Sequence, residues 1–133
     1  MKMPKLTQLT ISCEDRPGAL ARIAQLLGKA KINILALLAT AAGEGGLEGF
    51  VGLVVDQPQK AKKALEAAGM RYTEQPVLQI ELPNTPGALG AFVEKVAAKH
   101  INITAAYQTS VPGAKKASVV FAVSDFDKAA RIR

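Results

Sequence analysis

Two short loops carry the residues with which this chain could bind a charged small molecule. The first is Asp15-Arg16-Pro17-Gly18-Ala19-Leu20, and the second is Asn84-Thr85-Pro86-Gly87-Ala88-Leu89. In each loop, Pro-Gly predicts a tight turn, at which a ligand can approach the backbone closely. A helix is expected to begin there, and its first N–H groups favour a carboxylate or another anion.

An asparagine follows each loop and opens a predicted strand. The spacing from Asp15 to Asn33 is repeated from Asn84 to Asn102, and Ile34 and Ile103 follow the asparagines directly. An amide side chain both donates and accepts hydrogen bonds. A loop and an asparagine together could therefore hold the carboxylate and the ammonium of an amino acid, and apolar neighbours could contact its side chain.

The two loops belong to a longer internal repeat. Pro86 follows Pro17 by 69 positions (86 minus 17), and Asn102 follows Asn33 by the same 69 (102 minus 33). Asp56 and Asp125, each at the end of an apolar segment, fit the same offset (125 minus 56). We therefore predict two copies of one unit in a single gapless register.

Hydropathy patterns predict the same order of elements in each copy. Strands are expected at Leu6–Cys13, Ile32–Thr40, Leu47–Val55, Arg71–Glu74, Val77–Leu82, Ile101–Thr109 and Lys116–Val123. Helices are expected to begin at Pro17, Pro58 and Pro86, with the apolar face of the first repeated in the third. Pro76 is expected to separate the fourth strand from the fifth. The order predicts an α+β fold of two ferredoxin-like βαββαβ units, each an antiparallel sheet with both helices on one face.

The expected domains are residues 1–75 and residues 76–133. The second is expected to lack the end of its second helix and its last strand, because the chain given ends at Arg133. A sheet without one edge strand exposes unpaired backbone groups that a partner could cover.

Composition narrows the classes of function. The chain is 49% hydrophobic and 21% charged, with a formal net charge of +6, which is typical of a globular protein. Its one cysteine and one histidine exclude an internal disulfide and a Cys/His metal site. No nucleophile–base pair is visible, so we expect no catalytic residue, no metal and no cofactor. No segment is typical of a signal peptide or a membrane span, so we expect a cytoplasmic protein without a membrane partner.

The loop Asp/Asn-x-Pro-Gly-Ala-Leu, the amphipathic helix and the following Asn-Ile resemble the ACT domain, a small regulatory module. The resemblance covers nearly the whole chain, twice. It implies units that pair side by side, with an amino-acid effector at the joint between the first loop of one unit and the second-strand asparagine of the other. One implied site combines Asp15, Arg16, Pro17, Gly18, Ala19 and Leu20 with Asn102 and Ile103. The other combines Asn84, Thr85, Pro86, Gly87, Ala88 and Leu89 with Asn33 and Ile34.

The two implied sites are not identical. Asp15 carries a charge where Asn84 does not, and Arg16 stands where the other loop has Thr85. The two sites could therefore differ in affinity, or one alone could work. The resemblance also implies that a regulated metabolic enzyme or regulator is a separate chain, and the missing strand favours a homodimer.

Structural alternatives exist for these residues. Pro17 and Pro86 could simply begin helices, and Asn33 and Asn102 could take the left-handed conformation between a helix and a strand. Asp56 and Asp125 are interpreted as helix caps.

Four functions compete. The hypothesis that we favour is a non-catalytic regulatory module that binds a small amino acid at the interface between the two units. The runner-up is an adaptor that pairs with another protein through an open sheet edge. An RNA-binding protein of the same fold would need aromatic residues on the first strands, which have none, so we expect no nucleic-acid partner. A small acylphosphatase would need an arginine for phosphate and an asparagine for water, and Arg16, which lies in a suitable loop, has no basic counterpart at Thr85.

Overall fold

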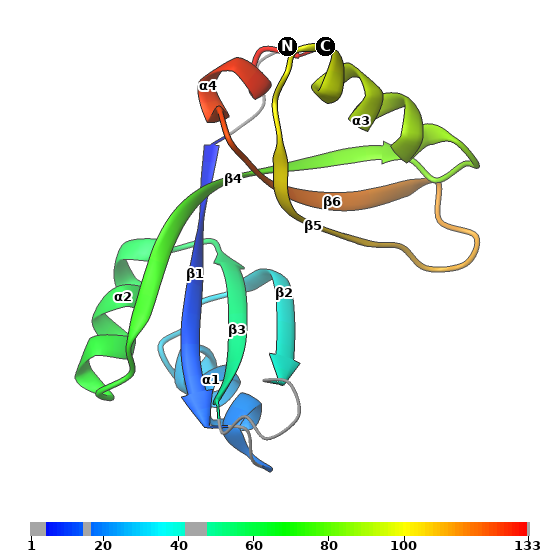
Figure 1. The fold of residues 1–133 in the computed structure, drawn as a ribbon. Helices are drawn as coiled ribbons and strands as arrows, with labels where there is room; N and C mark the ends of the chain where they lie inside the picture. Colours follow the sequence, from blue (N-terminus) through cyan, green and yellow to red (C-terminus); the bar gives the residue numbers. More distant parts are fainter. Residues whose placement is uncertain (1–4, 15–16, 42–47, 133) are drawn as a thin grey trace. The chain divides into compact units, whose positions relative to one another are not determined.

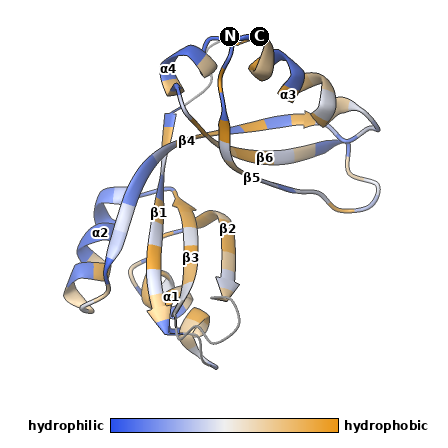
Figure 2. Cartoon of the chain, in the orientation of Figure 1, coloured by the Kyte–Doolittle hydropathy of each residue, from blue (hydrophilic) through white to orange (hydrophobic). Residues whose placement is uncertain are grey.

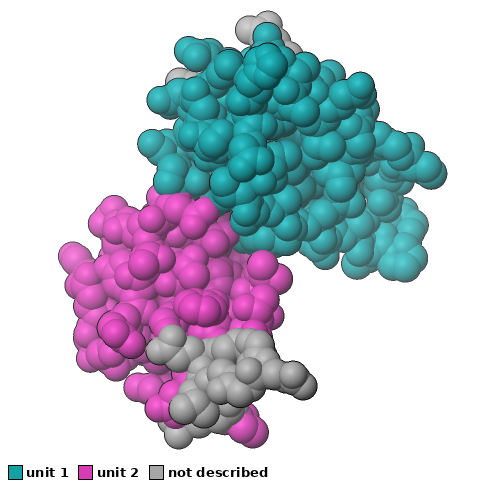
Figure 3. Space-filling model, in the orientation of Figure 1, with its two compact units in different colours: residues 1–6, 76–133 teal, residues 7–75 magenta. Residues whose placement is uncertain are grey.

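The computed structural model describes residues 5–14, 17–41 and 48–132 (Figure 1). Its residue contacts divide the chain into two compact units (Figure 3). Residues 7–75, magenta in Figure 3, are called the N-terminal unit, and residues 1–6 with 76–133, teal, are called the C-terminal unit. The division expected from the sequence, residues 1–75 and 76–133, stays a prediction, and each unit is described by its observed bounds.

The N-terminal unit has the strand order of a ferredoxin-like fold. Its elements are β1 (Lys5–Glu14), α1 (Ala19–Lys29), β2 (Ile34–Ala41), β3 (Glu48–Val55), α2 (Pro58–Ala67) and the start of β4 (Tyr72–Pro83). The strands lie in the order β2-β3-β1-β4, and β3 pairs antiparallel with both β1 and β2. This confirms the predicted α+β class and its order of elements.

One face of this sheet packs against both helices. Alternate residues of β1 and β3 point to that face, as a strand period of two requires. They meet the apolar stripes of α1 and α2, and the resulting core contains Leu9, Ile11, Val51, Leu53, Val55, Ile23, Leu27, Ile32, Ala61 and Leu65. In Figure 2, β3 is orange along much of its length, whereas α2 is mainly blue and presents only a narrow apolar stripe. The core therefore depends mostly on the central strands and on α1.

The C-terminal unit repeats the first part of this arrangement. It contains the rest of β4, α3 (Ala88–Ala98), β5 (Ile103–Thr109), β6 (Lys116–Val123) and α4 (Phe126–Ala129), and its strands lie in the order β4-β6-β5. Phe92 of α3 stacks on Phe121 of β6, with 5.3 Å between the ring centroids. The start of β1 also belongs here, since the Lys5 ammonium lies 5.3 Å from the centre of the Phe126 ring.

The expectation that Pro76 separates two strands is wrong. β4 runs without interruption from Tyr72 to Pro83, and Pro76 lies in its middle with an exposed side chain. Proline is compatible with strand backbone angles, and it is tolerated wherever the sheet does not need its missing N–H. The boundary between the two units coincides with this residue, because Gln75 belongs to one and Pro76 to the other.

The prediction of a gapless repeat is wrong beyond the second strand. β3 pairs Val55 with Ile34, and β6 pairs Val123 with Ile103. Ile103 lies 69 positions after Ile34 (103 minus 34), but Val123 lies 68 positions after Val55 (123 minus 55). The second hairpin is therefore one residue shorter, so that the counterpart of Asp56 is Ser124.

Of the two aspartates interpreted as helix caps, one is a cap. Asp125 is the N-cap of α4, and its carboxylate accepts a hydrogen bond from the Lys128 N–H at 3.1 Å. Asp56 is not a cap, because the N-cap of α2 is Gln57. Asp56 accepts a hydrogen bond from the Asn33 N–H instead, at 3.0 Å.

The left-handed residues before β2 and β5 are not the asparagines. Lys31 has a φ of 60° and His100 a φ of 58°, and each follows the C-cap residue of its helix. The Lys31 N–H donates to Gly28 O, and the Ile32 N–H donates to Leu27 O, which is the Schellman pattern of hydrogen bonds. The following Ile32 is buried, so this turn also contributes a side chain to the core.

Candidate functional site

Each predicted Pro-Gly loop leads into an uncapped helix start. Gly18 is the N-cap of α1 with a φ of 90°, and Gly87 is the N-cap of α3 with a φ of 87°. Neither start has a hydrogen bond from a capping side chain. Pro17 and Pro86 lie in the turns before the caps, so the interpretation that they begin the helices is wrong. Asp15 and Arg16 lie outside the described residues.

These starts leave N–H groups for an acceptor from outside the helix. In the first intrahelical hydrogen bond of α1, the Arg22 N–H donates to Gly18 O at 2.9 Å. In α3, the Ala91 N–H donates to Gly87 O at 3.0 Å. The N–H groups at the start of a helix have no intrahelical acceptor, and together they favour an anion. Both copies of the loop thus have the backbone geometry expected of a carboxylate site.

In the second loop, the polar residues are held by the backbone. The Asn84 side-chain amide donates to Ala114 O at 2.9 Å, and its N–H donates to Lys115 O at 2.9 Å. Thr85 O accepts a hydrogen bond from the Ala88 N–H at 3.2 Å. Asn84 therefore fixes the loop before α3 to the loop between β5 and β6.

Asn33 and Asn102 lie at the other ends of the helices. Within one unit the Pro-Gly turn precedes the helix and the asparagine follows it. An 11-residue helix separates the two by about 16 Å. A unit therefore does not bring its own turn and its own asparagine together. The predicted combination of a turn with the asparagine of another unit stays a prediction.

The apolar residues of the predicted sites fall into two groups. Ile34 and Ile103 pack against the cores of their own units. Leu20 and Leu89, in the first turns of α1 and α3, are 41% and 39% exposed. The two leucines are available to contact a ligand or a partner, whereas the two isoleucines mainly stabilise the fold.

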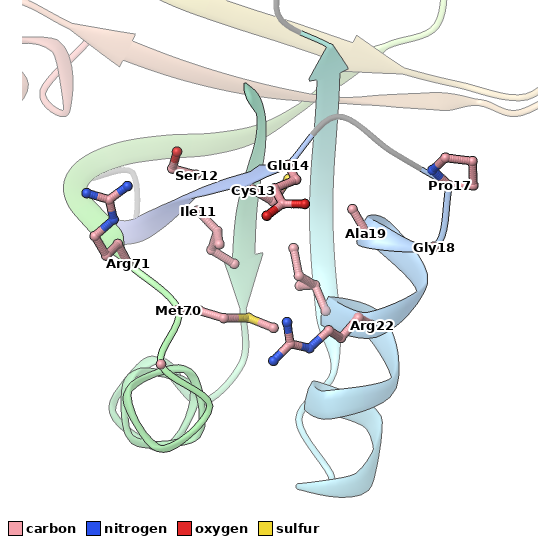
Figure 4. Close-up of a pocket in the computed structure, with 12 residues that line it drawn as sticks. Ile11, Ser12, Cys13, Glu14, Pro17, Gly18, Ala19, Arg22, Met70 and Arg71 are labelled. Atoms are coloured by element: carbon pink, nitrogen blue, oxygen red, sulfur yellow. The ribbon is translucent and has the colours of Figure 1, made fainter. Parts of the chain in front are cut away.

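A cavity of about 410 Å³ opens beside the start of α1 in the N-terminal unit (Figure 4). The end of β1, the first turns of α1 and the turn from α2 to β4 enclose it. Its lining residues are Ile11, Ser12, Cys13, Glu14, Pro17, Gly18, Ala19, Arg22, Ile23, Gly69, Met70 and Arg71. It therefore combines part of the predicted loop with two arginines and a carboxylate that the sequence analysis did not single out.

The side chains of opposite charge come from different elements. Arg22 extends from α1 toward Met70, whereas Arg71 lies on the other side of the cavity, near Ser12 (Figure 4). Glu14 stands at the end of β1, and both Glu14 and Arg71 already take part in interactions within the protein. The cavity thus presents positive and negative groups at once, which suits a zwitterion better than a simple anion.

A smaller hollow of about 180 Å³ lies on the other side of the start of α1, against β2 and β3. Leu20 lines this hollow, together with Ala39 and Phe50. Cys13, Glu14 and Ala19 line both hollows. The start of α1 is therefore accessible from two sides.

A third, shallow hollow contains Tyr72, whose hydroxyl donates a hydrogen bond to the Glu66 carboxylate at 2.5 Å. This hydrogen bond, partial burial and the negative charges of Glu66 and Glu74 raise the pKa of Tyr72 to about 12. Tyr72 is therefore a neutral donor at physiological pH and not a base.

Across residues 5–14, 17–41 and 48–132, no three His, Cys, Asp or Glu side chains gather in a group that could hold a metal ion. In the same part of the chain, none of the helices has the length and apolar character needed to cross a bilayer.

Comparisons with known proteins point to one family. Residues 7–69 match the family model of the ACT domain. The chain is 30% identical to protein BT0572 from Bacteroides thetaiotaomicron, with a TM-score of 0.85 over 94% of this chain and 83% of that one. No curated protein sequence matches the chain significantly.

The fold is also that of two solved regulatory subunits. The ligand-free regulatory subunit of aspartate kinase from Thermus thermophilus has a TM-score of 0.72 at 20% identity, over 98% of this chain and 93% of that one. The corresponding subunit from Thermus flavus has a TM-score of 0.66 at 21% identity, over 98% and 92%. At these identities the two likenesses show the fold alone. The chain belongs to the ACT domain family, with two such units in tandem.

Proposed function

We propose that this protein binds a small amino acid as a regulatory effector and has no catalytic activity of its own. The observation that carries the proposal is the uncapped start of α1 beside a cavity with side chains of both charges. An amino acid carries a carboxylate and an ammonium a few ångströms apart. The N–H groups of a helix start and an arginine suit the first, and a glutamate suits the second.

The energetic requirement is modest. Micromolar affinity corresponds to about 8 kcal/mol. Hydrogen bonds to charged groups contribute about 1.5–3 kcal/mol each, so a few of them account for much of this.

The family resemblance implies an effector at an interface between units, where a Pro-Gly turn meets the asparagine of another unit. The structure supports this part of the proposal in one respect. Asn33 and Asn102 are exposed, and in the described residues their side-chain amides have no hydrogen-bond partner. They therefore remain able to donate to a carboxylate and to accept from an ammonium.

We also propose that the protein forms a homodimer and acts on a separate enzyme or regulator. β2 pairs only with β3 in the described part of the N-terminal unit, so its other edge has unpaired backbone groups. Three leucines on this strand are unusually exposed, Leu35 at 45%, Leu37 at 39% and Leu38 at 44%. An uncharged, leucine-rich strand edge favours pairing with the same strand of a second copy.

An adaptor that binds another protein through β2 is the alternative function, and the same leucines favour it. Isothermal titration calorimetry with each standard amino acid, combined with the molar mass in solution, separates the two functions. We expect micromolar binding of at least one small amino acid by a dimer. The absence of heat with every amino acid would leave the adaptor as the better explanation.

A further inference from the structure

The cavity beside α1 is built from the N-terminal unit alone. Glu14 ends β1, Arg22 lies one turn into α1, and Met70 and Arg71 connect α2 to β4. A ligand there needs no residue of another unit. The site that the family resemblance implies at an interface, in contrast, also needs an asparagine from another unit.

Arg22 is the basic group best placed to bind a ligand in this cavity. Its side chain is exposed and extends from α1 into the space in front of Met70 (Figure 4). Within the described residues, the Arg22 guanidinium makes no ion pair or hydrogen bond that would hold it in this position. Its planar fork of N–H donors matches a carboxylate in two-point geometry. The uncapped N–H groups of the same helix lie one turn earlier.

Glu14 supplies the opposite charge. It is exposed at the end of β1 and already takes part in an interaction within the protein. A carboxylate accepts several hydrogen bonds through its two oxygens, so that interaction leaves capacity for a ligand ammonium. The cavity therefore has an acceptor for a cation and a donor for an anion.

The floor of the cavity is apolar. The half-buried Met70 lines it, and beneath the surface Ile11 is fully buried and Ile23 is 1% exposed. The volume of about 410 Å³ is within the range of small-molecule sites. An aliphatic side chain would be desolvated against Met70, and the charged groups of the lining would stay available for the carboxylate and the ammonium.

Comparison of the two copies shows that Arg22 and Glu14 are not needed for the fold. Ala91 stands in α3 where α1 has Arg22, and Pro83 stands where β1 has Glu14. The two units share the Pro-Gly turn and the uncapped helix, but only the N-terminal unit adds the charged pair.

We infer that this cavity is a binding site for one aliphatic α-amino acid per chain, separate from any site at an interface between units. The carboxylate lies against Arg22 and the start of α1, the ammonium against Glu14, and the side chain against Met70. The inference rests on the proposed amino-acid binding and adds its location, its stoichiometry and its ligand class.

The test uses the whole chain with both asparagines replaced, Asn33→Ala with Asn102→Ala, so that an interface site is impaired. Calorimetric titration with valine, leucine and isoleucine should still show one equivalent bound per chain. Adding Arg22→Gln should weaken binding about 10- to 100-fold, the change expected from losing a hydrogen bond to a charged group. Lys29→Ala, a loss of charge at the other end of α1, is the matched control and should leave the affinity unchanged.

A second comparison tests the role of Glu14. Glu14→Gln should weaken leucine binding about tenfold but leave binding of 4-methylpentanoate, which is leucine without its ammonium, unchanged. Circular dichroism melts establish that each variant is folded.

Four results would overturn the inference. If the unmodified protein binds amino acids but the double asparagine variant does not, the effector site is at an interface and the proposed function stands. If Arg22→Gln binds leucine as tightly as its parent, or if only charged amino acids bind, the cavity is not the site described. If the unmodified protein binds no amino acid, the proposed function itself fails.

Discussion

Asn33 and Asp56 exchange two hydrogen bonds that fix the start of β2 to the end of β3. The Asn33 N–H donates to the Asp56 carboxylate at 3.0 Å, and the Asp56 N–H donates to Asn33 O at 3.1 Å. Asn102 and Ser124 repeat this pair, with distances of 2.9 and 2.8 Å. The backbone of each asparagine is thus fixed while its side chain stays available, which is what a ligand-binding residue requires.

The first prediction concerns this pair. Asp56→Ala removes the acceptor and leaves the Asn33 N–H without its partner, so the free energy of unfolding should fall by about 1 kcal/mol. Asp56→Ser should lose less, because a serine hydroxyl performs the same role at Ser124. Urea denaturation followed by circular dichroism measures both variants. Equal stability of Asp56→Ala and the unmodified protein would show that the hydrogen bond contributes nothing.

The same pair shows how far the sequence could predict the fold. Periodic apolar residues and the repeated Pro-Gly and Asn-Ile segments were sufficient for the order of strands and helices. They were not sufficient for register, because a one-residue difference between two hairpins leaves hydropathy patterns almost unchanged. Asp56 and Asp125 matched in the sequence, yet Ser124 takes the place of Asp56.

The site was harder to predict than the fold. The Pro-Gly turns repeat, so they could be found, and in the structure each leads into a helix without a side-chain cap. Arg22 and Glu14 do not repeat, and Met70 approaches them only because the turn after α2 packs beside the end of β1. Such a contact between segments distant in sequence leaves no local pattern. In the sequence, the sign of Arg22 and Glu14 is a mismatch between the two copies, which have Ala91 and Pro83 at the matching positions.

Lys31 provides the second prediction. Its φ of 60° is strained for a residue with a Cβ, whereas glycine adopts it freely. Lys31→Gly should therefore raise the free energy of unfolding by about 1 kcal/mol, and Lys31→Ala should not. Thermal and urea denaturation test both. A destabilised Lys31→Gly would mean that the lysine side chain contributes more than the backbone strain removes.

The third prediction concerns pH. The chain has two tyrosines, and the pKa of Tyr72 is raised to about 12 by its hydrogen bond to Glu66. Since the folded pKa lies above the unfolded value of 10.0, this hydrogen bond stabilises the fold below pH 10 and is lost as the pH rises through 12. Ultraviolet titration of a Tyr107→Phe variant isolates Tyr72. Adding Glu66→Gln should lower the observed pKa toward 10, and an unchanged pKa would exclude Glu66 as its cause.

The exposed leucines of β2 give the fourth prediction. Leu37→Lys places a charge on the strand edge proposed to pair with a second copy, so it should convert the dimer to a monomer. Sedimentation equilibrium measures the change. Val111→Lys is the control, because Val111 is 66% exposed on a loop of the other unit and should not affect the mass. A Leu37→Lys protein that remains dimeric would place the interface elsewhere.

The last prediction concerns the two N-cap glycines and tests which unit binds the amino acid. Gly18 and Gly87 have nearly the same left-handed φ, and a Cβ at either would meet no atom within 4 Å. Alanine at either position should therefore destabilise the protein through backbone strain alone, by about 1–2 kcal/mol. Only Gly18→Ala should also weaken amino-acid binding, because Arg22 and Glu14 line the cavity beside α1, whereas Ala91 and Pro83 stand at the matching positions of the second copy. Calorimetric titration of both variants decides this, and a larger loss of affinity in Gly87→Ala would place the effector in the C-terminal unit.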